Sequence, residues 1–386
     1  LWETFWAGLG RSPFATLRAV MRYLGNRAAL KAALAQIAPL RTDLLPVNGE
    51  VADLALQSRV GGREVVLASG SDESLVAPLA AHYGLSERVF ASDGHTNLTG
   101  PRKAAELVRA FGEGGFDYAG NSATDMAVWE RADNALVVGH VSSARTLASR
   151  GQNVVELAGG LDWRALVKAL RPHQWVKNVL LVLPMIAAHR FDLETLIPIL
   201  WGIVAFSAAA SSIYIVNDLL DLEADRLHPT KRNRPFASGA LPITVGMAVF
   251  VVCALIAVTV AAALNMSFLG VILLYMVTSL AYSLKLKRRR WVDVATLAAL
   301  YTIRVIAGAA AAQVYVSIYM LIFIFPIFIT LGCVKRLTEL TLALHCATKP
   351  RLTISLVFAC RRPLASWSYS YATPAPLCYT HSPATR

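Results

Sequence analysis

The sequence predicts a chain with two structural parts, an α/β domain followed by an all-α bundle of transmembrane helices. Hydrophobic residues fill 55% of its 386 positions, which is more than a soluble core of that size needs. They are unevenly distributed, because charged residues dilute them up to about Asp162 and long apolar runs then occupy residues 179–334. Before Asp162, short apolar runs alternate with amphipathic stretches, a pattern typical of strand and helix units around a parallel sheet.

Charge and cysteine content exclude two classes of function. The formal net charge is +12, but the Lys and Arg residues cluster at the ends of apolar runs instead of forming a patch interleaved with aromatic side chains. We therefore expect no nucleic-acid partner. The five cysteines include no CxxC pair and no accompanying His cluster, which argues against a zinc site or a disulfide framework and favours a reducing, cytoplasmic face.

The α/β domain is expected to occupy residues 1–160, with the turn at Gly159 and Gly160 marking its end. Helical periodicity at residues 13–39 predicts a small cap over the sheet. The expected strands and helices alternate in the order strand 65–69, helix 73–83, helix 101–111, strand 116–120, helix 123–132 and strand 135–139.

The bundle is expected to occupy residues 161–344 and to contain about six spans. A helix needs about 20 residues to cross a bilayer, and five apolar runs are long enough, at residues 193–216, 240–264, 266–284, 291–312 and 314–334. A shorter run at residues 175–188 is expected to add the sixth. Lys and Arg gather in alternate loops, and cytoplasmic loops collect such residues. This pattern predicts a multi-pass protein of the inner membrane whose N-terminal domain is cytoplasmic.

A cluster of acids follows the second predicted span, in the segment Asn217-Asp218-Leu-Leu-Asp221-Leu-Glu-Ala-Asp225. If the helix continues, Asn217, Asp221 and Asp225 recur every four residues on one face. Asp218 lies beside Asp221 on that face. Crowded carboxylates repel one another unless a cation lies among them, and Mg²⁺ prefers a few carboxylates together with phosphate oxygens. The segment therefore predicts a Mg²⁺ site, and a solvated, charged helix end is the alternative.

Further polar residues are expected at the same membrane face. Lys231 and Arg234 follow the acids and are candidates for binding phosphate. A second polar set contains Tyr282, Lys285 and Asp293, of which Asp293 is a candidate for a second Mg²⁺ and Lys285 for a phosphate oxygen. Basic residues that only enforce membrane topology are the alternative.

One arginine falls well inside an apolar span. Arg304 lies within residues 291–312, where an unpaired guanidinium is costly. We therefore expect Arg304 to face the interior of the bundle and to meet an anion or a carboxylate.

Three motifs in this order resemble the UbiA-type prenyltransferase superfamily. They are RPHQWVKN at residues 171–178, the NDxxDxxxD block at residues 217–225, and YSxxLK at residues 282–287 with the later Asp293. The resemblance implies a helical bundle with a central cavity, bound Mg²⁺ and a diphosphate-bearing donor. It assigns the catalytic and metal-binding roles to Asp218, Asp221, Asp225 and Asp293.

Within that superfamily, the RPHQWVKN segment and the KRLTEL block at residues 335–340 are most similar to the decaprenyl-phosphate phosphoribosyltransferase branch. This branch makes cell wall precursors from phosphoribosyl diphosphate as donor and a polyprenyl phosphate as acceptor. The many basic residues would suit two phosphorylated substrates. Prenyl transfer to an aromatic acceptor, a transporter and an inactive membrane fragment are the alternatives. The candidate substrate-binding residues are Lys177, Asn217, Lys231, Arg234, Tyr282, Lys285, Arg304 and Lys335.

Residues 65–125 resemble the haloacid dehalogenase-type phosphatase superfamily, which implies a Rossmann-like fold. The likeness rests on Ser69 after a predicted strand, on Lys103 in the segment NLTGPRK, and on the loop GNSATD at residues 120–125. The resemblance implies that Ser69 and Lys103 bind a phosphoryl group. Asn121 and Asp125 would form a Mg²⁺ loop that is weaker by one charge, because Asn121 stands where the superfamily has an acid. A turn serine and a solvated lysine are the alternatives.

Both ends of the chain depart from these patterns. Residues 1–48 contain no apolar strand that ends in the DxD sequence of such phosphatases. We therefore expect either that this first strand precedes Leu1 or that the phosphatase-like half is inactive. Residues 345–386 contain no Asp, no Glu and no further apolar span, which predicts an aberrant, unstructured tail and a change of reading frame near Leu344. The bundle cavity is accordingly expected to be incomplete.

Overall fold

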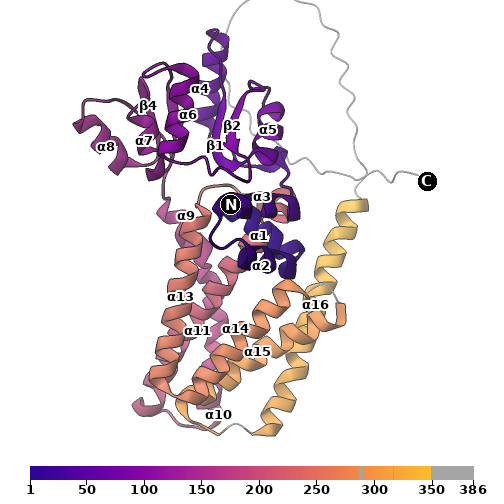
Figure 1. Ribbon diagram of the computed structural model, residues 1–386. Coiled ribbons are helices and arrows are strands. Elements are labelled where there is room, and N and C mark those ends of the chain that lie inside the picture. The colour runs from indigo at the N-terminus through magenta and orange to yellow at the C-terminus, as the bar shows by residue number, and fades with distance from the viewer. Residues whose placement is uncertain (287–289, 316, 349–386) are drawn as a thin grey trace, which may run out of the picture.

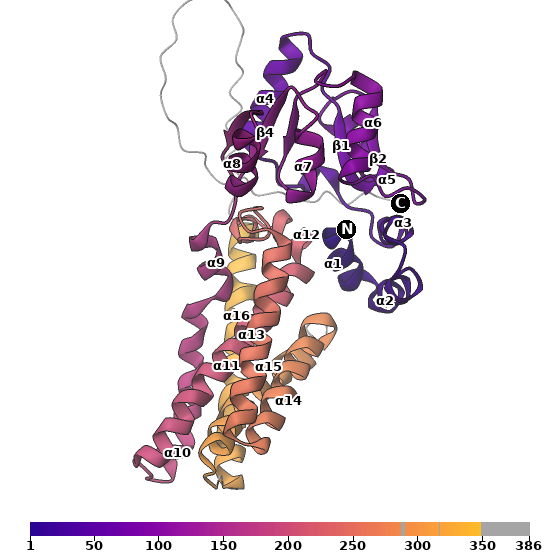
Figure 2. The same cartoon turned by 60° about the vertical axis from the view of Figure 1, so that its left-hand side comes forward.

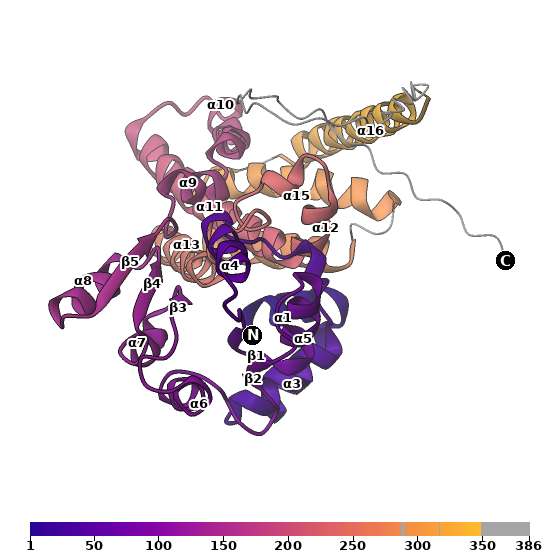
Figure 3. The ribbon, with the colours of Figure 1, turned by 90° about the horizontal axis from the view of Figure 1, so that it is seen from above.

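The computed structural model describes residues 1–286, 290–315 and 317–348. An α/β region and a bundle of long helices are stacked on one another, as Figure 1 shows. Both predicted parts are therefore present. The α/β region lies over one side of the end of the bundle, and the last described helix lies on the opposite side (Figure 3).

The strands of the α/β region are all parallel, as predicted, but they form two sheets instead of one. Strands β1 (Leu67–Asp72) and β2 (Val89–Ser92) form the first sheet, and β3 (Tyr118–Gly120), β4 (Asn134–Val138) and β5 (Asn153–Leu157) form the second. The register of β1 against β2 is regular only at Leu67 and Ala68 and shifts before Asp72, so β1 is a weakly paired strand.

Helices pack on these strands and form a small apolar core around the fully buried Trp129, Val128 and Leu147. The helices predicted at residues 73–83 and 101–111 are confirmed, whereas β2, α8 and β5 had not been predicted. The helices of this region are α4 (Gly49–Val60), α5 (Glu73–His82), α6 (Pro101–Phe111), α7 (Met126–Trp129) and α8 (Val141–Ser149), with the 3-10 turns η1 (Thr42–Leu44) and η2 (Ala123–Asp125).

Three N-terminal helices lie between the α/β region and the bundle (Figure 2). They are α1 (Trp2–Arg11), α2 (Pro13–Arg22) and α3 (Arg27–Ile37). Asn26 caps the N-terminus of α3, and its side chain accepts a hydrogen bond from the backbone N–H of Ala29 at 3.1 Å. It packs on β1, which agrees with the predicted cap, whereas α1 packs on the bundle instead.

The bundle consists of α11 (Leu193–Leu220), α13 (Ile243–Leu264), α14 (Met266–Leu284), α15 (Arg290–Ala312) and α16 (Ile318–Thr348). In the part of the chain that is described, four helices are long and apolar enough to cross a membrane, namely α11, α13, α14 and residues 292–312 of α15. The apolar part of α16, Ile318–Val334, is shorter than a full span. Fully buried side chains such as Ile199, Phe206, Phe268 and Ile272 form the core between these helices.

The predicted sixth span is not a regular α-helix. Helix α9 (Trp163–Leu170) leads into η3 (Pro172–Val182), a 3-10 helix of 11 residues, and then into the short α10 (Leu183–Ala187). A 3-10 helix rises about 2.0 Å per residue, so η3 and α10 together extend about 30 Å. Figure 2 shows this segment running along the bundle from α9 to α10. The stretched form lets a short segment follow the bundle over its length.

Candidate functional site

The acid-rich segment lies at the end of α11 that faces the α/β region (Figure 1). The helix does not continue unbroken through this segment, because α11 ends at Leu220, Asp221 adopts φ −100° and ψ 13°, and α12 (Leu222–Leu227) follows. Hydrogen bonds between residues four positions apart, as in an α-helix, are nevertheless kept on both sides of the break. The N–H of Asp221 donates to Asn217 O at 3.0 Å, and the N–H of Asp225 donates to Asp221 O at 2.8 Å.

Two arginines neutralise the buried acids of this segment. Asp218 and Asp225 are each only 2% exposed. Arg234 Nη1 lies 3.2 Å from Asp218 Oδ1 and 2.6 Å from Asp225 Oδ2, so its guanidinium bridges the two carboxylates. Arg171 Nη2 lies 2.5 Å from Asp218 Oδ1. Buried carboxylates require such partners, because an uncompensated buried charge is costly.

Arg171 had been noted only as the first residue of a motif, and its role depends on an unusual backbone. It adopts φ 53° and ψ 56°, a left-handed conformation that costs a non-glycine residue about 1–3 kcal/mol. Contacts around it hold this conformation. Trp175 Nε1 donates to Ser211 Oγ at 3.0 Å, Ser211 Oγ donates to Leu170 O at 2.8 Å, and the Arg171 guanidinium lies 5.3 Å from the centroid of the Tyr214 ring.

The predicted metal ligands are not gathered into one cluster. Among the described residues, no group of three or more His, Cys, Asp and Glu side chains could hold a metal ion. Asp218 and Asp225 meet at Arg234, whereas Asp293, in α15, accepts a hydrogen bond from the hydroxyl of Tyr282 at 2.7 Å. The four-carboxylate Mg²⁺ site therefore stays a prediction.

One buried oxygen nevertheless suits a cation. The side-chain oxygen of Asn217 is buried and has no hydrogen-bond partner in the described part of the chain. A buried acceptor without a donor costs about 1–3 kcal/mol, and a bound cation would remove this cost. Asn217 is followed by Asp218 and Asp221, and amide and carboxylate oxygens are ligands that Mg²⁺ accepts. The donor chemistry at the end of α11 thus fits Mg²⁺.

The predicted cations occupy different positions. Lys231, in η4 (Lys231–Asn233), and Lys285, after the end of α14, are exposed at the end of the bundle. Lys177 is half-buried in η3, with Nζ 5.8 Å from the centroid of the Tyr301 ring. Lys287 and the side chain of Lys335 lie outside the described residues.

Arg304 faces the interior of the bundle, as predicted, and is 5% exposed. The expected anion or carboxylate partner stays a prediction, because no carboxylate contacts Arg304 among the residues that the structure describes. Its guanidinium instead donates to three neutral oxygens, at 3.2 Å to Asn178 Oδ1, at 2.7 Å to Leu300 O and at 3.4 Å to the hydroxyl of Tyr275.

Aromatic rings supply the rest of the surroundings of Arg304. The carbon at the centre of its guanidinium lies 5.1–5.4 Å from the ring centroids of Phe206, Tyr275 and Tyr301, a distance at which a π face attracts a cation. Asn178, which had been noted only within a motif, links Arg304 to α11 by donating to Ser207 Oγ at 2.9 Å. Neither residue type nor spacing predicts this pairing, because residues 178 and 304 lie far apart in the chain.

Comparison with known proteins decides the family. The sequence profile described as the UbiA prenyltransferase family matches residues 179–340, a range that includes the acid-rich segment, Asp293 and Arg304. The decaprenyl-phosphate phosphoribosyltransferase of Mycobacterium tuberculosis is 37% identical over 229 residues, which cover 55% of this chain and 72% of that protein. The chain belongs to the UbiA prenyltransferase family.

This UbiA-family chain has relatives that extend beyond the bundle. The protein y4nM of Sinorhizobium fredii, described as uncharacterized, is 34% identical over 346 residues, which cover 88% of this chain but only 66% of that protein. A solved structure of a UbiA homolog from Archaeoglobus fulgidus bound to DMAPP and Mg²⁺ is 20% identical, with a TM-score of 0.38, and the match covers 43% of this chain and 60% of that one.

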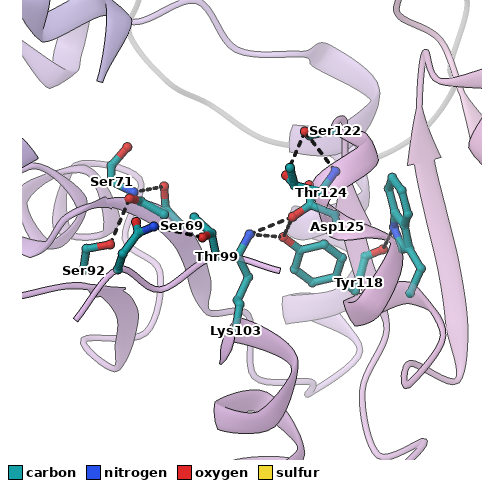
Figure 4. Close-up of polar contacts among 12 residues, drawn as sticks. Ser69, Ser71, Ser92, Thr99, Lys103, Tyr118, Ser122, Thr124 and Asp125 are labelled. Carbon is teal, nitrogen blue, oxygen red and sulfur yellow. Dashed lines mark hydrogen bonds and ion pairs between the residues drawn. The ribbon is translucent and has the colours of Figure 1, made fainter. Parts of the chain in front are cut away.

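The α/β region lies outside the UbiA match, and its predicted residues are only partly gathered. Lys103 Nζ lies 2.8 Å from Asp125 Oδ1 and 2.8 Å from the hydroxyl of Tyr118, which itself donates to Asp125 (Figure 4). Burial raises the pKa of Tyr118 far above its ordinary value, and the carboxylate of Asp125 raises it further. Asn121 is exposed beyond β3.

Ser69 lies within β1 and not at its C-terminal end, so its predicted position is wrong. The strand continues to Asp72 because pairing with β2, which lapses after Ala68, resumes there. Ser69 Oγ accepts a hydrogen bond from the N–H of Ser71 at 3.1 Å (Figure 4). The haloacid dehalogenase-type assignment therefore stays a prediction.

A second buried lysine of the α/β region had not been predicted. Lys31, from α3, donates to Gly70 O and, at 2.6 Å, to Asn97 Oδ1. Burial lowers the pKa of Lys31 below its ordinary value, and the charges of Arg27 and Lys103 lower it further. Helical periodicity at residues 13–39 gives no signal that this one lysine points into the sheet.

Proposed function

We propose that the bundle transfers a phosphoribosyl group from phosphoribosyl diphosphate to a polyprenyl phosphate, and that the transfer requires Mg²⁺. Membership of the UbiA family and the names of the mycobacterial relatives support this reaction class. The observation that carries the proposal is the arginine-bridged pair Asp218 and Asp225 beside the unpartnered oxygen of Asn217. We also propose an inner-membrane protein with a cytoplasmic α/β region.

In this proposal, Asn217, Asp218 and Asp221 hold the metal ion. Mg²⁺ there would neutralise charge on the departing diphosphate. Arg171 and Arg234 contact Asp218, and their guanidinium groups would also be able to bind phosphate oxygens of the donor. Exposed lysines at the same end, such as Lys231 and Lys285, attract the anionic donor.

The acceptor is proposed to bind deeper in the bundle. The cation of Arg304 is held only by neutral oxygens and aromatic faces, so it can still bind an anionic group. A polyprenyl phosphate supplies such a group together with an apolar chain that suits the core of the bundle. A neutral aromatic acceptor would leave the charge of Arg304 without a counterion.

The α/β region is proposed to be a haloacid dehalogenase-type domain that removes the 5-phosphate from the lipid-linked product. Ser69 and Lys103 would bind the phosphoryl group, and Asp125 with Asn121 would form a weakened metal loop. The full chain should release inorganic phosphate from phosphoribosylated polyprenyl phosphate. Absence of phosphate release above the rate of the buffer without protein would contradict this part of the proposal.

The main proposal is tested with the full chain in lipid nanodiscs. We expect Mg²⁺-dependent formation of a phosphoribosylated lipid from phosphoribosyl diphosphate and polyprenyl phosphate. Prenyl diphosphates with an aromatic acceptor form the second arm. Product in that arm alone would favour the aromatic-acceptor alternative, and no product in either arm would favour an inactive membrane fragment.

A further inference from the structure

One face of α1 lies against the acid-rich segment. Residues three or four positions apart share one side of a helix. In α1 this spacing joins Glu3, Trp6 and Gly10, and it also joins Ala7 and Arg11. Helix α1 packs on α11 and α13, and Figure 2 shows it beside α12. This face is not part of the UbiA match, which begins at residue 179.

Two ion pairs join α1 to α12. Glu3 pairs with Arg226, whose side chain is 9% exposed, and Arg11 pairs with Glu223 in a more exposed position. Exposed pairs contribute little to stability, whereas breaking a buried pair leaves an uncompensated charge. The pair between Glu3 and Arg226 is therefore the stronger constraint on α12.

Arg226 connects this pair to the site. It is the residue after Asp225, and its Nε donates to Ala237 O at 3.3 Å. Its guanidinium thus ties α12 both to α1 and to the turn that follows Arg234. Glu223 and Arg226 lie on either side of Asp225 in the sequence of α12, and both are held by α1.

Close packing supports the same placement. A Cβ atom at Gly10 would lie 3.1 Å from the carbonyl oxygen of Leu220, the last residue of α11 before Asp221. A larger residue at this position would therefore require α1 or the end of α11 to shift by a few tenths of an ångström. Trp6 is buried and belongs to one apolar cluster with Val216 and Leu219 of α11.

A cavity of about 300 Å³ lies between these elements. Helix α1 contributes Glu3, Gly10 and Arg11 to its lining, and Asp221 and Ser283 also line it. Its volume is at the lower limit of ordinary ligand sites. The N-terminal helix thus lines a space that reaches a residue of the acid-rich segment.

We propose that α1 is a structural wall of the transferase site and that Glu3 is a positioning residue for Asp221 and Asp225. The inference rests on the proposed function, because it concerns the same acids. Without Glu3, the buried charge of Arg226 has no counterion, α12 is less firmly held, and binding of the diphosphate donor weakens. Loss of a supporting partner around metal ligands typically lowers affinity about 10- to 100-fold.

The test uses the full chain in nanodiscs with phosphoribosyl diphosphate and polyprenyl phosphate. Glu3→Gln is expected to raise KM for the donor about 10-fold with a smaller change in kcat, and to speed hydrogen exchange of residues 221–227. The charge swap Glu3→Arg with Arg226→Glu should restore both values. Gly10→Val, which pushes α1 off Leu220 without changing charge, should act like Glu3→Gln.

Arg109→Ala is the matched control, because it breaks the exposed pair between Arg109 and Glu106 in α6. Unchanged exchange of residues 221–227 in both Glu3→Gln and Gly10→Val would overturn the inference. Faster exchange with an unchanged KM would also overturn it, since α1 would then be only a structural support. If no variant and no wild-type protein makes product, the proposed function fails, while faster exchange would still support the placement of α1.

Discussion

The bundle and the α/β region each pair a cation with a buried carboxylate, but the hydrogen-bonding groups of the two sites are satisfied to different degrees. In the bundle, Arg234 bridges Asp218 and Asp225 while the oxygen of Asn217 lacks a partner in the described residues. In the α/β region, Lys103, Asp125 and Tyr118 satisfy one another. The bundle site thus has a buried acceptor that a cation could bind, whereas Lys103, Asp125 and Tyr118 already hydrogen-bond one another.

The largest effect should come from breaking the hydrogen-bonded set of Lys103, Tyr118 and Asp125. Lys103→Met leaves the buried carboxylate of Asp125 without its counterion, which should lower the free energy of unfolding of the α/β region by about 3–5 kcal/mol. Chemical unfolding followed by tryptophan fluorescence measures this, since Trp129 lies in the same core. The double variant Lys103→Met with Asp125→Leu should recover much of the loss. If the single variant is as stable as the wild type, the pair carries no structural role.

The second largest effect is expected at the acid-rich segment of the bundle. Asp218→Ala with Asp221→Ala should lower transfer by about 10²–10³-fold, because the groups that stabilise charge on the departing diphosphate are lost. Formation of the phosphoribosylated lipid is the measurement. Glu106→Ala, an exposed carboxylate of α6, should leave transfer unchanged. Undiminished transfer in the double variant would remove the basis for assigning the site to the acid-rich segment.

Arg304 offers an intermediate case, a buried cation with only neutral partners. Arg304→Met should leave Asn178 Oδ1 without a donor and lower the free energy of unfolding of the bundle by about 1–3 kcal/mol. Arg304→Lys should not restore it fully, because an ammonium cannot match the planar set of donors. Thermal unfolding in detergent tests both. Arg190→Ala, in an exposed pair with Asp192, is the control and should change little.

The smallest effect is expected in the pH dependence of stability. It comes from Lys31, which, unlike Lys103, has only neutral hydrogen-bond partners in the α/β region. Lys31 donates to neutral oxygens, and burial lowers its pKa below the ordinary value. Between that lowered pKa and the ordinary value of about 10.4, the unfolded chain holds a proton that the folded chain has released. Stability contributed by this group therefore rises with pH across the window. Lys31→Met should flatten the pH dependence of thermal unfolding in this alkaline window. An identical slope in both proteins would contradict the burial of Lys31.

The order of the elements could be predicted from the sequence, because period and run length are local properties. The two-part division, the parallel strands and the apolar helices are of this kind. The acids could be predicted as a group, since Asn217, Asp218, Asp221 and Asp225 are close in sequence. Partners from distant segments could not. Arg171 meets Asp218 only because of a left-handed backbone at the end of α9, and Arg304 meets Asn178 across 126 positions.

Local geometry that depends on tertiary packing could not be predicted from the sequence either. Apolar composition at residues 175–188 indicates a buried helix but does not distinguish an α-helix from the 3-10 form that η3 adopts. The break at Asp221 has no proline or glycine to mark it. The role of Lys31 is set by β1, which lies 36 or more positions further along the chain.

The winding of η3 sets a length. Rewinding its 11 residues from the 3-10 form to an α-helix would shorten the segment by about 5 Å, because the rise falls from about 2.0 to about 1.5 Å per residue. Asn178 accepts a hydrogen bond from Arg304. The backbone of Leu181 packs against Gly308 so closely that a Cβ atom at Gly308 would lie only 2.0 Å from the carbonyl oxygen of Leu181. Either contact would be lost on rewinding. Gly308 therefore permits the close approach of η3 to α15, and a larger residue at this position would displace η3 from the bundle.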